Sequence, residues 1–217
     1  MIISKAQLEE ILKSVYNNRN PFLSEAQLQF DLAIALEKHF ESQSPDRYKI
    51  YLEYPTVNTT TNARVYYDIV IKDVETKGYC PIELKYKTKN ATVIFDGAEI
   101  DLKNHAAQDL GRFDYLKDVE RIENFNAFTG KTKEAGYAII LTNDHNYWSA
   151  GRAGCIYADF ALNNGRKIVK GLKSWAAGTK ETSVGKSRIN GLTLKDSYYI
   201  EWKNLDNNFK FLMLEIK

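Results

Sequence analysis

The chain lacks the residue patterns that mark several common classes of protein. Its 217 residues include two cysteines, Cys80 and Cys155, and three histidines. Two cysteines cannot build a disulfide framework or a cysteine-rich zinc site, and the histidines show no metal-ligand spacing. A Gly-rich phosphate loop and a nucleophile elbow are also absent from the sequence. The sequence therefore does not indicate a disulfide scaffold, a P-loop nucleotide hydrolase or a serine hydrolase.

Long apolar runs and strong net charge are missing as well. The sequence has no apolar run of membrane-spanning length and no signal-peptide core, so we expect a cytoplasmic protein with no membrane partner. A net charge of +2 does not by itself indicate a nucleic-acid-binding protein, and permits one only if the charge is unevenly distributed. Hydrophobic residues at 44% and charged residues at 27% are typical of a soluble globular protein.

The hydrophobic periodicity predicts an α/β fold with a central mixed β-sheet flanked by helices. Helices are predicted from Ser4 and from Ser24, each opening with a Ser-x-x-Gln capping pattern, and over Leu102 to Phe125. Strands are predicted over residues 48–54, 67–71, 81–86 and 135–142, and over 197–202 and 209–216, which form a C-terminal β-hairpin. A polar loop is expected over 56–63, either a short strand or an excursion over 91–100, and an irregular segment over 165–188. We expect one domain over residues 1–217, with its core at about 22–142 and a C-terminal elaboration at 143–217.

Three charged residues interrupt two strands that otherwise read as buried. Asp68 lies in the first strand, residues 67–71, and Glu83 and Lys85 lie in the second, residues 81–86. Glu83 and Lys85 are two residues apart and therefore project from the same face of their strand. Because burying a charge is costly unless it is paired or binds a metal, these residues are candidates for a metal site. The alternative is that Asp68 is a surface cap and the other two form an ion pair on a solvated strand.

The acid on one strand and the acid-x-Lys on the next resemble the active-site signature of the PD-(D/E)XK nuclease superfamily. Glu83 follows Asp68 by 15 residues, and Tyr67 stands where the family pattern has proline. The order of the flanking helices and strands also fits, so the resemblance covers about residues 22–142. It implies a restriction endonuclease-like fold and an endonuclease that hydrolyses DNA with Mg²⁺ or Mn²⁺.

The resemblance also implies roles for individual residues. Asp68, Glu83 and the backbone carbonyl of Leu84 would bind the metal, while Lys85 would orient the attacking water or neutralise the scissile phosphate. Glu25 matches a glutamate that many members carry on the helix before the strands. The alternative for Glu25 is a first-turn acid that stabilises its helix dipole.

A later helix and several basic residues are candidates for contacts with DNA. Gln108, Arg112 and Tyr115 lie at i, i+4 and i+7 on one helix face, which resembles the Gln-and-Tyr helix that closes the site in RecB-like members. The resemblance implies that Gln108 would act in catalysis, touching a metal-bound water or phosphate, and that Arg112 would bind phosphate. The alternative is a solvated face with ordinary intrahelical pairs. The other candidates lie on the exit of the second strand and in the basic segment 165–188, whose alternative is a solvated loop: Lys87, Lys89, Lys170, Lys173 and Trp175.

The sequence leaves three functions open. The first is a Mg²⁺-dependent deoxyribonuclease with DNA as its partner, in which a homodimer would suit double-strand cleavage. The second is a catalytically inactive module of the same fold that binds nucleic acid or a protein partner. The third is an RNA-directed nuclease, which only substrate preference would distinguish.

Overall fold

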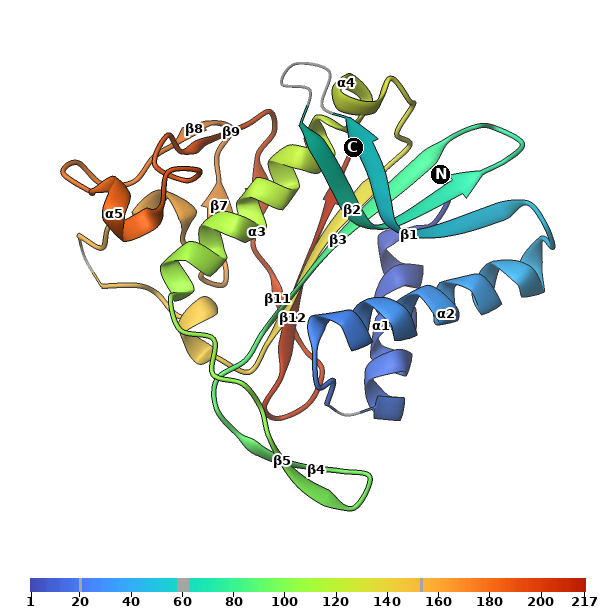
Figure 1. Cartoon of the computed structure of the whole chain (residues 1–217), viewed down its shortest axis with the longest axis horizontal. Helices are drawn as coiled ribbons and strands as arrows, with labels where there is room; N and C mark the ends of the chain where they lie inside the picture. The colour runs from blue at the N-terminus through green and yellow to red at the C-terminus, as the bar shows by residue number, and fades with distance from the viewer. Residues whose placement is uncertain (20, 58–62, 153) are drawn as a thin grey trace. The chain divides into compact units, whose positions relative to one another are not determined.

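The computed structural model describes residues 1–19, 21–57, 63–152 and 154–217 (Figure 1). These residues form two compact units. The first unit comprises residues 1–86, 122–139 and 215–217, and the second comprises residues 87–121 and 140–214. In the described part of the chain, every helix is too short or too polar to cross a lipid bilayer.

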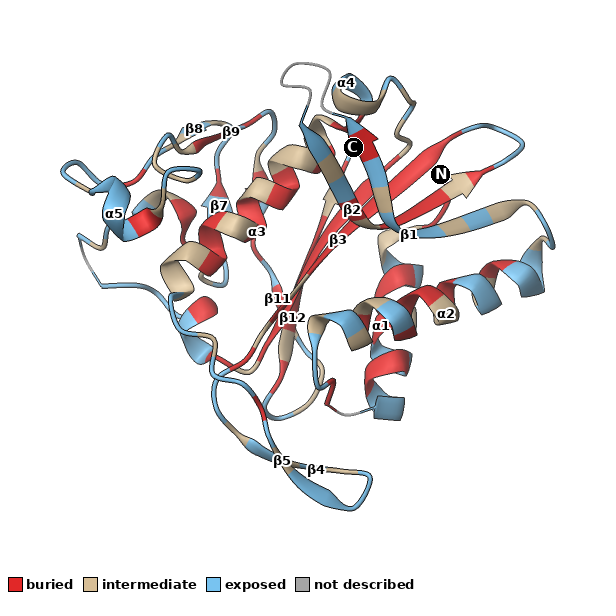
Figure 2. Ribbon diagram, in the orientation of Figure 1, coloured by how far each residue is buried: buried red, intermediate tan, exposed pale blue. Residues whose placement is uncertain are grey.

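The central feature is a six-stranded mixed sheet, which confirms the predicted mixed α/β class. Its strands in spatial order are β1 (Tyr48–Val57), β2 (Arg64–Asp73), β3 (Tyr79–Lys87), β6 (Gly136–Thr142), β12 (Lys210–Ile216) and β11 (Trp202–Asn204). The β1–β2, β2–β3 and β11–β12 pairs are antiparallel. Buried residues run along β3, and all seven residues of β6 are buried (Figure 2). The continuous apolar run of β6 is what a strand covered on both faces requires.

Two long helices of the first unit begin where the capping patterns predict. In α1 (Lys5–Arg19), Gln7 N–H donates to Ser4 Oγ and Ser4 N–H donates to Gln7 Oε1. In α2 (Glu25–Gln43), Gln27 N–H donates to Ser24 Oγ at 3.1 Å. These bonds satisfy amide groups that the first helical turn leaves without partners. Helix α2 packs on β1 and β2, and α1 packs on α2.

The loop predicted between the first two sheet strands is only partly described. Thr56 and Val57 belong to the end of β1 rather than to a loop, because they pair with Val65 and Arg64 of β2. Residues 58–62 of the predicted loop lie outside the described residues.

The helix predicted from Leu102 begins later and is divided. Helix α3 spans Gln108–Glu123, and a short helix, α4, spans Phe125–Thr129. Ala107 has a φ of 62°, which is incompatible with a right-handed helix and ends the preceding segment. The residues before Ala107 instead bond to Thr88, which directly follows β3. His105 N–H donates to the Thr88 carbonyl, and Thr88 N–H donates to His105 Nδ1. Gly111 does not break α3; a Cβ at this position would overlap the Tyr147 hydroxyl.

The second unit contains several short elements. Residues 91–100 form most of a hairpin of β4 (Thr92–Phe95) and β5 (Ala98–Asp101), whose Asp96-Gly97 turn has positive φ at both residues. The short 3-10 helices His145–Tyr147 and Ala158–Phe160 follow β6.

The prediction of an irregular segment over 165–188 is wrong in part. It contains β7 (Lys167–Ile168), β8 (Gly171–Lys173) and α5 (Glu181–Val184). Strand β8 pairs with β9 (Leu192–Leu194), and β7 pairs with β10 (Tyr198–Tyr199). The C-terminal hairpin is therefore shorter than predicted, because residues 198–199 pair with β7 and only β11 pairs with β12.

An ion pair between a half-buried arginine and a buried aspartate closes the end of the β1–β2 ladder. Arg47 Nη2 lies 2.8 Å from Asp73 Oδ2, and Asp73 Oδ1 accepts hydrogen bonds from the N–H groups of Glu75 and Thr76. Burial would raise the pKa of the Asp73 carboxyl, but the hydrogen bonds from Arg47, Thr76 and Glu75 outweigh it, so the pKa is lowered. The ionised carboxylate thus stabilises the turn between β2 and β3.

We predict that this carboxylate makes folding stability depend on acid pH. Its lowered pKa means that the stabilisation is fully present above the ordinary carboxyl pKa and is lost as pH falls through the folded-state value. Urea unfolding should show Asp73→Asn to be less stable than wild type by about 1–3 kcal/mol at pH 7, with a smaller difference at pH 3. An equal difference at both pH values would contradict the assignment.

Candidate active site on two neighbouring strands

The acids predicted to form the site meet where β2 runs alongside β3. The β2–β3 ladder pairs Lys72 with Tyr79 and continues to Ile69 opposite Ile82. Extending this register by one pair places Asp68 opposite Glu83. The predicted proximity of these two positions therefore follows from the antiparallel pairing of the strands.

Two charged side chains bond to the main chain of one residue of β3, Leu84. Its N–H donates to Asp68 Oδ2 at 2.6 Å, and its carbonyl accepts a hydrogen bond from Lys85 Nζ at 3.2 Å. Glu83, the residue before it, is only 1% exposed, and Lys85 is half-buried. The Leu84 main chain thus bonds to the Asp68 carboxylate through its N–H and to the Lys85 ammonium through its carbonyl.

Helix α2 is joined to both strands by two side chains one turn apart. Glu25 Oε2 accepts a hydrogen bond from the Tyr86 N–H at 2.7 Å. Gln29 Nε2 donates to the Asp68 carbonyl at 2.7 Å and to Glu53 Oε1 at 2.8 Å. The structure therefore brings Glu25 next to the strand that carries Glu83 and Lys85 and gives its carboxylate a main-chain partner there, while its catalytic role stays a prediction.

Glu53 is a further acid near the site that the sequence analysis missed. It lies on β1 between Leu52 and Tyr54, which pair with Ile69 and Tyr67 on either side of Asp68. Its φ of 46° is unusual for a residue within a strand. Its side chain accepts from the Gln29 amide that also bonds to Asp68. The sequence signal was an acid among the apolar and aromatic residues Leu52, Tyr51 and Tyr54.

The oxygen atoms at this place suit a hard divalent cation. Two carboxylates, Asp68 and Glu83, and one main-chain carbonyl, Leu84, are the ligand types that Mg²⁺ prefers, and Mg²⁺ usually keeps several waters. The residues that the structure describes include no group of three or more His, Cys, Asp and Glu side chains placed to hold a metal ion. A cation here would therefore depend on the two carboxylates, the carbonyl and water.

The two helix residues predicted to contact substrate belong to the second unit and face the segment that follows β6. Gln108 Nε2 donates to Asp144 Oδ2 at 2.8 Å. Arg112 is 2% exposed, and its Nη2 donates to the Asn146 carbonyl. The two side chains share one face of α3, as the spacing predicted. Their contact with a substrate stays a prediction.

The predicted basic and aromatic contacts with DNA differ in exposure. Lys89 and Lys170 are exposed, while Lys87 and Lys173 are half-buried. Trp175 is 7% exposed, its ring stacks on Phe113 with centroids 5.6 Å apart, and its Nε1 donates to the Arg188 carbonyl. Little of this ring is left to stack on a base, so we do not include Trp175 in a DNA-binding surface.

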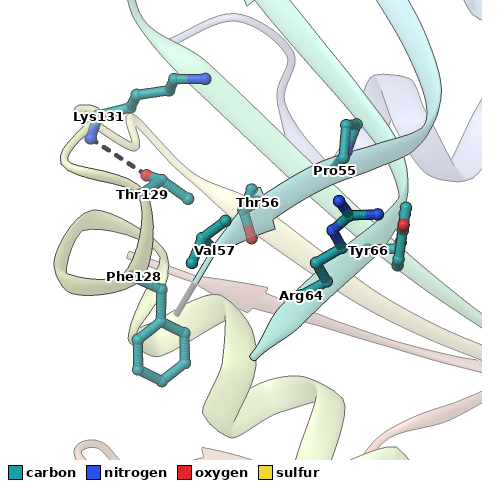
Figure 3. A pocket seen from close by; sticks show the side chains of 8 residues that line it. All are labelled: Pro55, Thr56, Val57, Arg64, Tyr66, Phe128, Thr129 and Lys131. Carbon is teal, nitrogen blue, oxygen red and sulfur yellow. Dashed lines mark hydrogen bonds between the residues drawn. The ribbon is translucent and has the colours of Figure 1, made fainter. Parts of the chain in front are cut away.

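A pocket of about 370 Å³ lies at the ends of β1 and β2 in the first unit (Figure 3). Arg64 and Tyr66 lie next to each other on β2 at its rim, and both are exposed. Lys131 also lines the pocket, and its ammonium lies 4.5 Å from the centre of the Tyr54 ring. Because side chains alternate along a strand, Arg64 and Tyr66 share a face of β2 with Asp68. This alternation is also visible in the sequence.

Comparison of the chain with models of protein families, with curated proteins and with solved structures gives no match.

Proposed function

We propose that this protein is a Mg²⁺- or Mn²⁺-dependent phosphodiester hydrolase of the PD-(D/E)XK type that acts on DNA as an endonuclease. The observation that supports the proposal is the convergence at Leu84, where its N–H meets the Asp68 carboxylate and its carbonyl meets the Lys85 ammonium. The buried Glu83 carboxylate next to it supplies the second acid of the motif. All of these residues belong to the first unit.

The residues divide the chemistry between them. Asp68, Glu83 and the Leu84 carbonyl would hold the divalent cation, which when bound supplies Lewis-acid polarisation of the phosphoryl oxygen and a more acidic water. Lys85 would orient the attacking water and offset negative charge on the scissile phosphate. Water attack on phosphorus breaks the bond to the 3′ oxygen, which takes up a proton. The products are a 5′-phosphate and a 3′-hydroxyl.

Glu25 and Gln29 would act as positioning residues in this scheme. Each bonds to the main chain of a site-bearing strand, Glu25 to Tyr86 and Gln29 to Asp68. Partners of this kind hold the residues that bind metal and substrate in their productive geometry. Loss of either bond would loosen the site without removing a metal ligand.

We predict that Glu83→Gln and Lys85→Ala each lower nicking of supercoiled plasmid, in Mg²⁺ or Mn²⁺, on the order of 100-fold or more. Lys49→Ala is the matched control, since this exposed lysine lies on β1 outside the proposed site. Circular dichroism of each variant checks that the fold is retained. Cutting by Lys85→Ala at the wild-type rate would refute the mechanism. Metal-independent DNA binding by a wild type that cuts with neither metal would favour the inactive binding module.

We also propose that DNA passes over Arg64 and Tyr66, because both are exposed on the face of β2 that carries Asp68. Arg64→Gln should weaken the binding of an oligonucleotide about equally for different sequences, as expected for a contact with phosphate. The slope of log K against log salt should fall in magnitude by about one. Fluorescence anisotropy in Ca²⁺, across a series of salt concentrations, measures both the binding constant and its salt slope. An unchanged salt slope would place the DNA elsewhere.

A further inference from the structure

The second unit buries an arginine that forms no ion pair with any described residue. Arg112 is 2% exposed, and its Nε is buried and has no hydrogen-bond partner among the described residues. Its Nη2 donates to the Asn146 carbonyl. The guanidinium carbon lies 5.2 Å from the centre of the Tyr147 ring and 4.3 Å from that of Tyr157. Contacts with two aromatic rings only partly offset the cost of burying a cation.

Two acids on the same elements, Asp144 and Asp114, are bonded to other groups. Asp144 accepts from the Gln108 side chain, and Asp114 accepts from Arg188 at 2.7 and 2.9 Å. Neither carboxylate forms an ion pair with Arg112. Burying a cation that forms no ion pair is costly, and an anion that reached it would offset that cost.

A cavity gives an anion access to this arginine. It measures about 630 Å³ and is lined by the first turns of α3 and by residues 145–146, 149–152 and 155–157, all in the second unit. This volume is typical of small-molecule sites. Besides Arg112, its lining offers Arg152, His145 and Ser149 as donors, and Asp109 as one opposing charge.

We propose that this cavity binds a phosphate group, carried either by a free nucleotide or by the backbone of a nucleic acid. A guanidinium presents a planar set of donors that matches phosphate oxygens, and the unused Nε of Arg112 belongs to that set. The further donors suit the three or four oxygens of a phosphate better than the two of a carboxylate. The proposal does not depend on hydrolysis at Asp68 and Glu83, so either can fail without the other.

Cys155 provides a direct readout of the cavity. It is a half-buried free cysteine in the lining, whereas the other cysteine, Cys80, is 1% exposed. Burial also raises the pKa of the Cys80 thiol, which keeps it unreactive. The rate of alkylation of the intact native chain therefore reports Cys155, and a Cys155→Ser variant verifies this.

The experiment measures that rate with no addition, with inorganic phosphate, with a deoxynucleoside monophosphate and with a short single-stranded oligonucleotide, all in EDTA. We expect saturable, several-fold slowing by at least one phosphate-bearing molecule. Arg112→Met should abolish the slowing. Because that variant removes a buried side chain, the exposed Arg152→Gln serves as a second test and should weaken the protection. Lys186→Gln, which removes an exposed charge of the same unit outside the cavity, should leave it unchanged.

The results separate the two sources of phosphate. Protection by the monophosphate but not by the oligonucleotide identifies a free nucleotide as the ligand. Protection by the oligonucleotide that Arg152→Gln weakens identifies a nucleic-acid phosphate. Unchanged alkylation with every anion, or protection that survives in Arg112→Met and in Arg152→Gln, overturns the proposal.

Discussion

The hydrogen bond from the Leu84 N–H to the Asp68 carboxylate is the contact on which the rest of the candidate site depends. It joins a side chain of β2 to the main chain of β3 at the residue between Glu83 and Lys85. The carbonyl of the same residue then accepts from Lys85. Helix α2 supports the arrangement through Gln29, whose amide bonds to the Asp68 carbonyl.

Both units bury charge, and this accounts for the two proposed binding sites. In the first unit Glu83 is 1% exposed within an apolar strand, and in the second Arg112 is 2% exposed between two tyrosine rings. A buried charge lowers stability unless another charge or a ligand compensates it. A divalent cation would add to the contacts that the acids already make, and a phosphate would compensate the arginine. We thus propose ligands of opposite charge for the two sites, a cation for the first and a phosphate for the second.

Local patterns in the sequence predicted the core of the sheet, because β2, β3 and β6 are apolar strands. They also singled out Asp68 and Glu83 as candidate site residues, because a charge is unusual in such a strand. They failed where distant pairing decides the structure. The start of α3 is set by Ala107 and by the bonds between Thr88 and His105, and the strands of the C-terminal region pair with partners about 20 to 30 residues away. The burial of Arg112 was also missed, because its covering tyrosines follow β6 and are remote in sequence.

The most direct test of the account is the binding of Mn²⁺ to the protein without DNA, measured by calorimetry. The account predicts saturable binding by the wild type and a loss of affinity of about 10-fold or more in Asp68→Asn. Asp101→Asn is the matched control, because this exposed acid ends the β4–β5 hairpin, and it should bind as the wild type does. A wild type that binds no Mn²⁺, or an Asp68→Asn variant that binds it equally well, would contradict the proposed metal site.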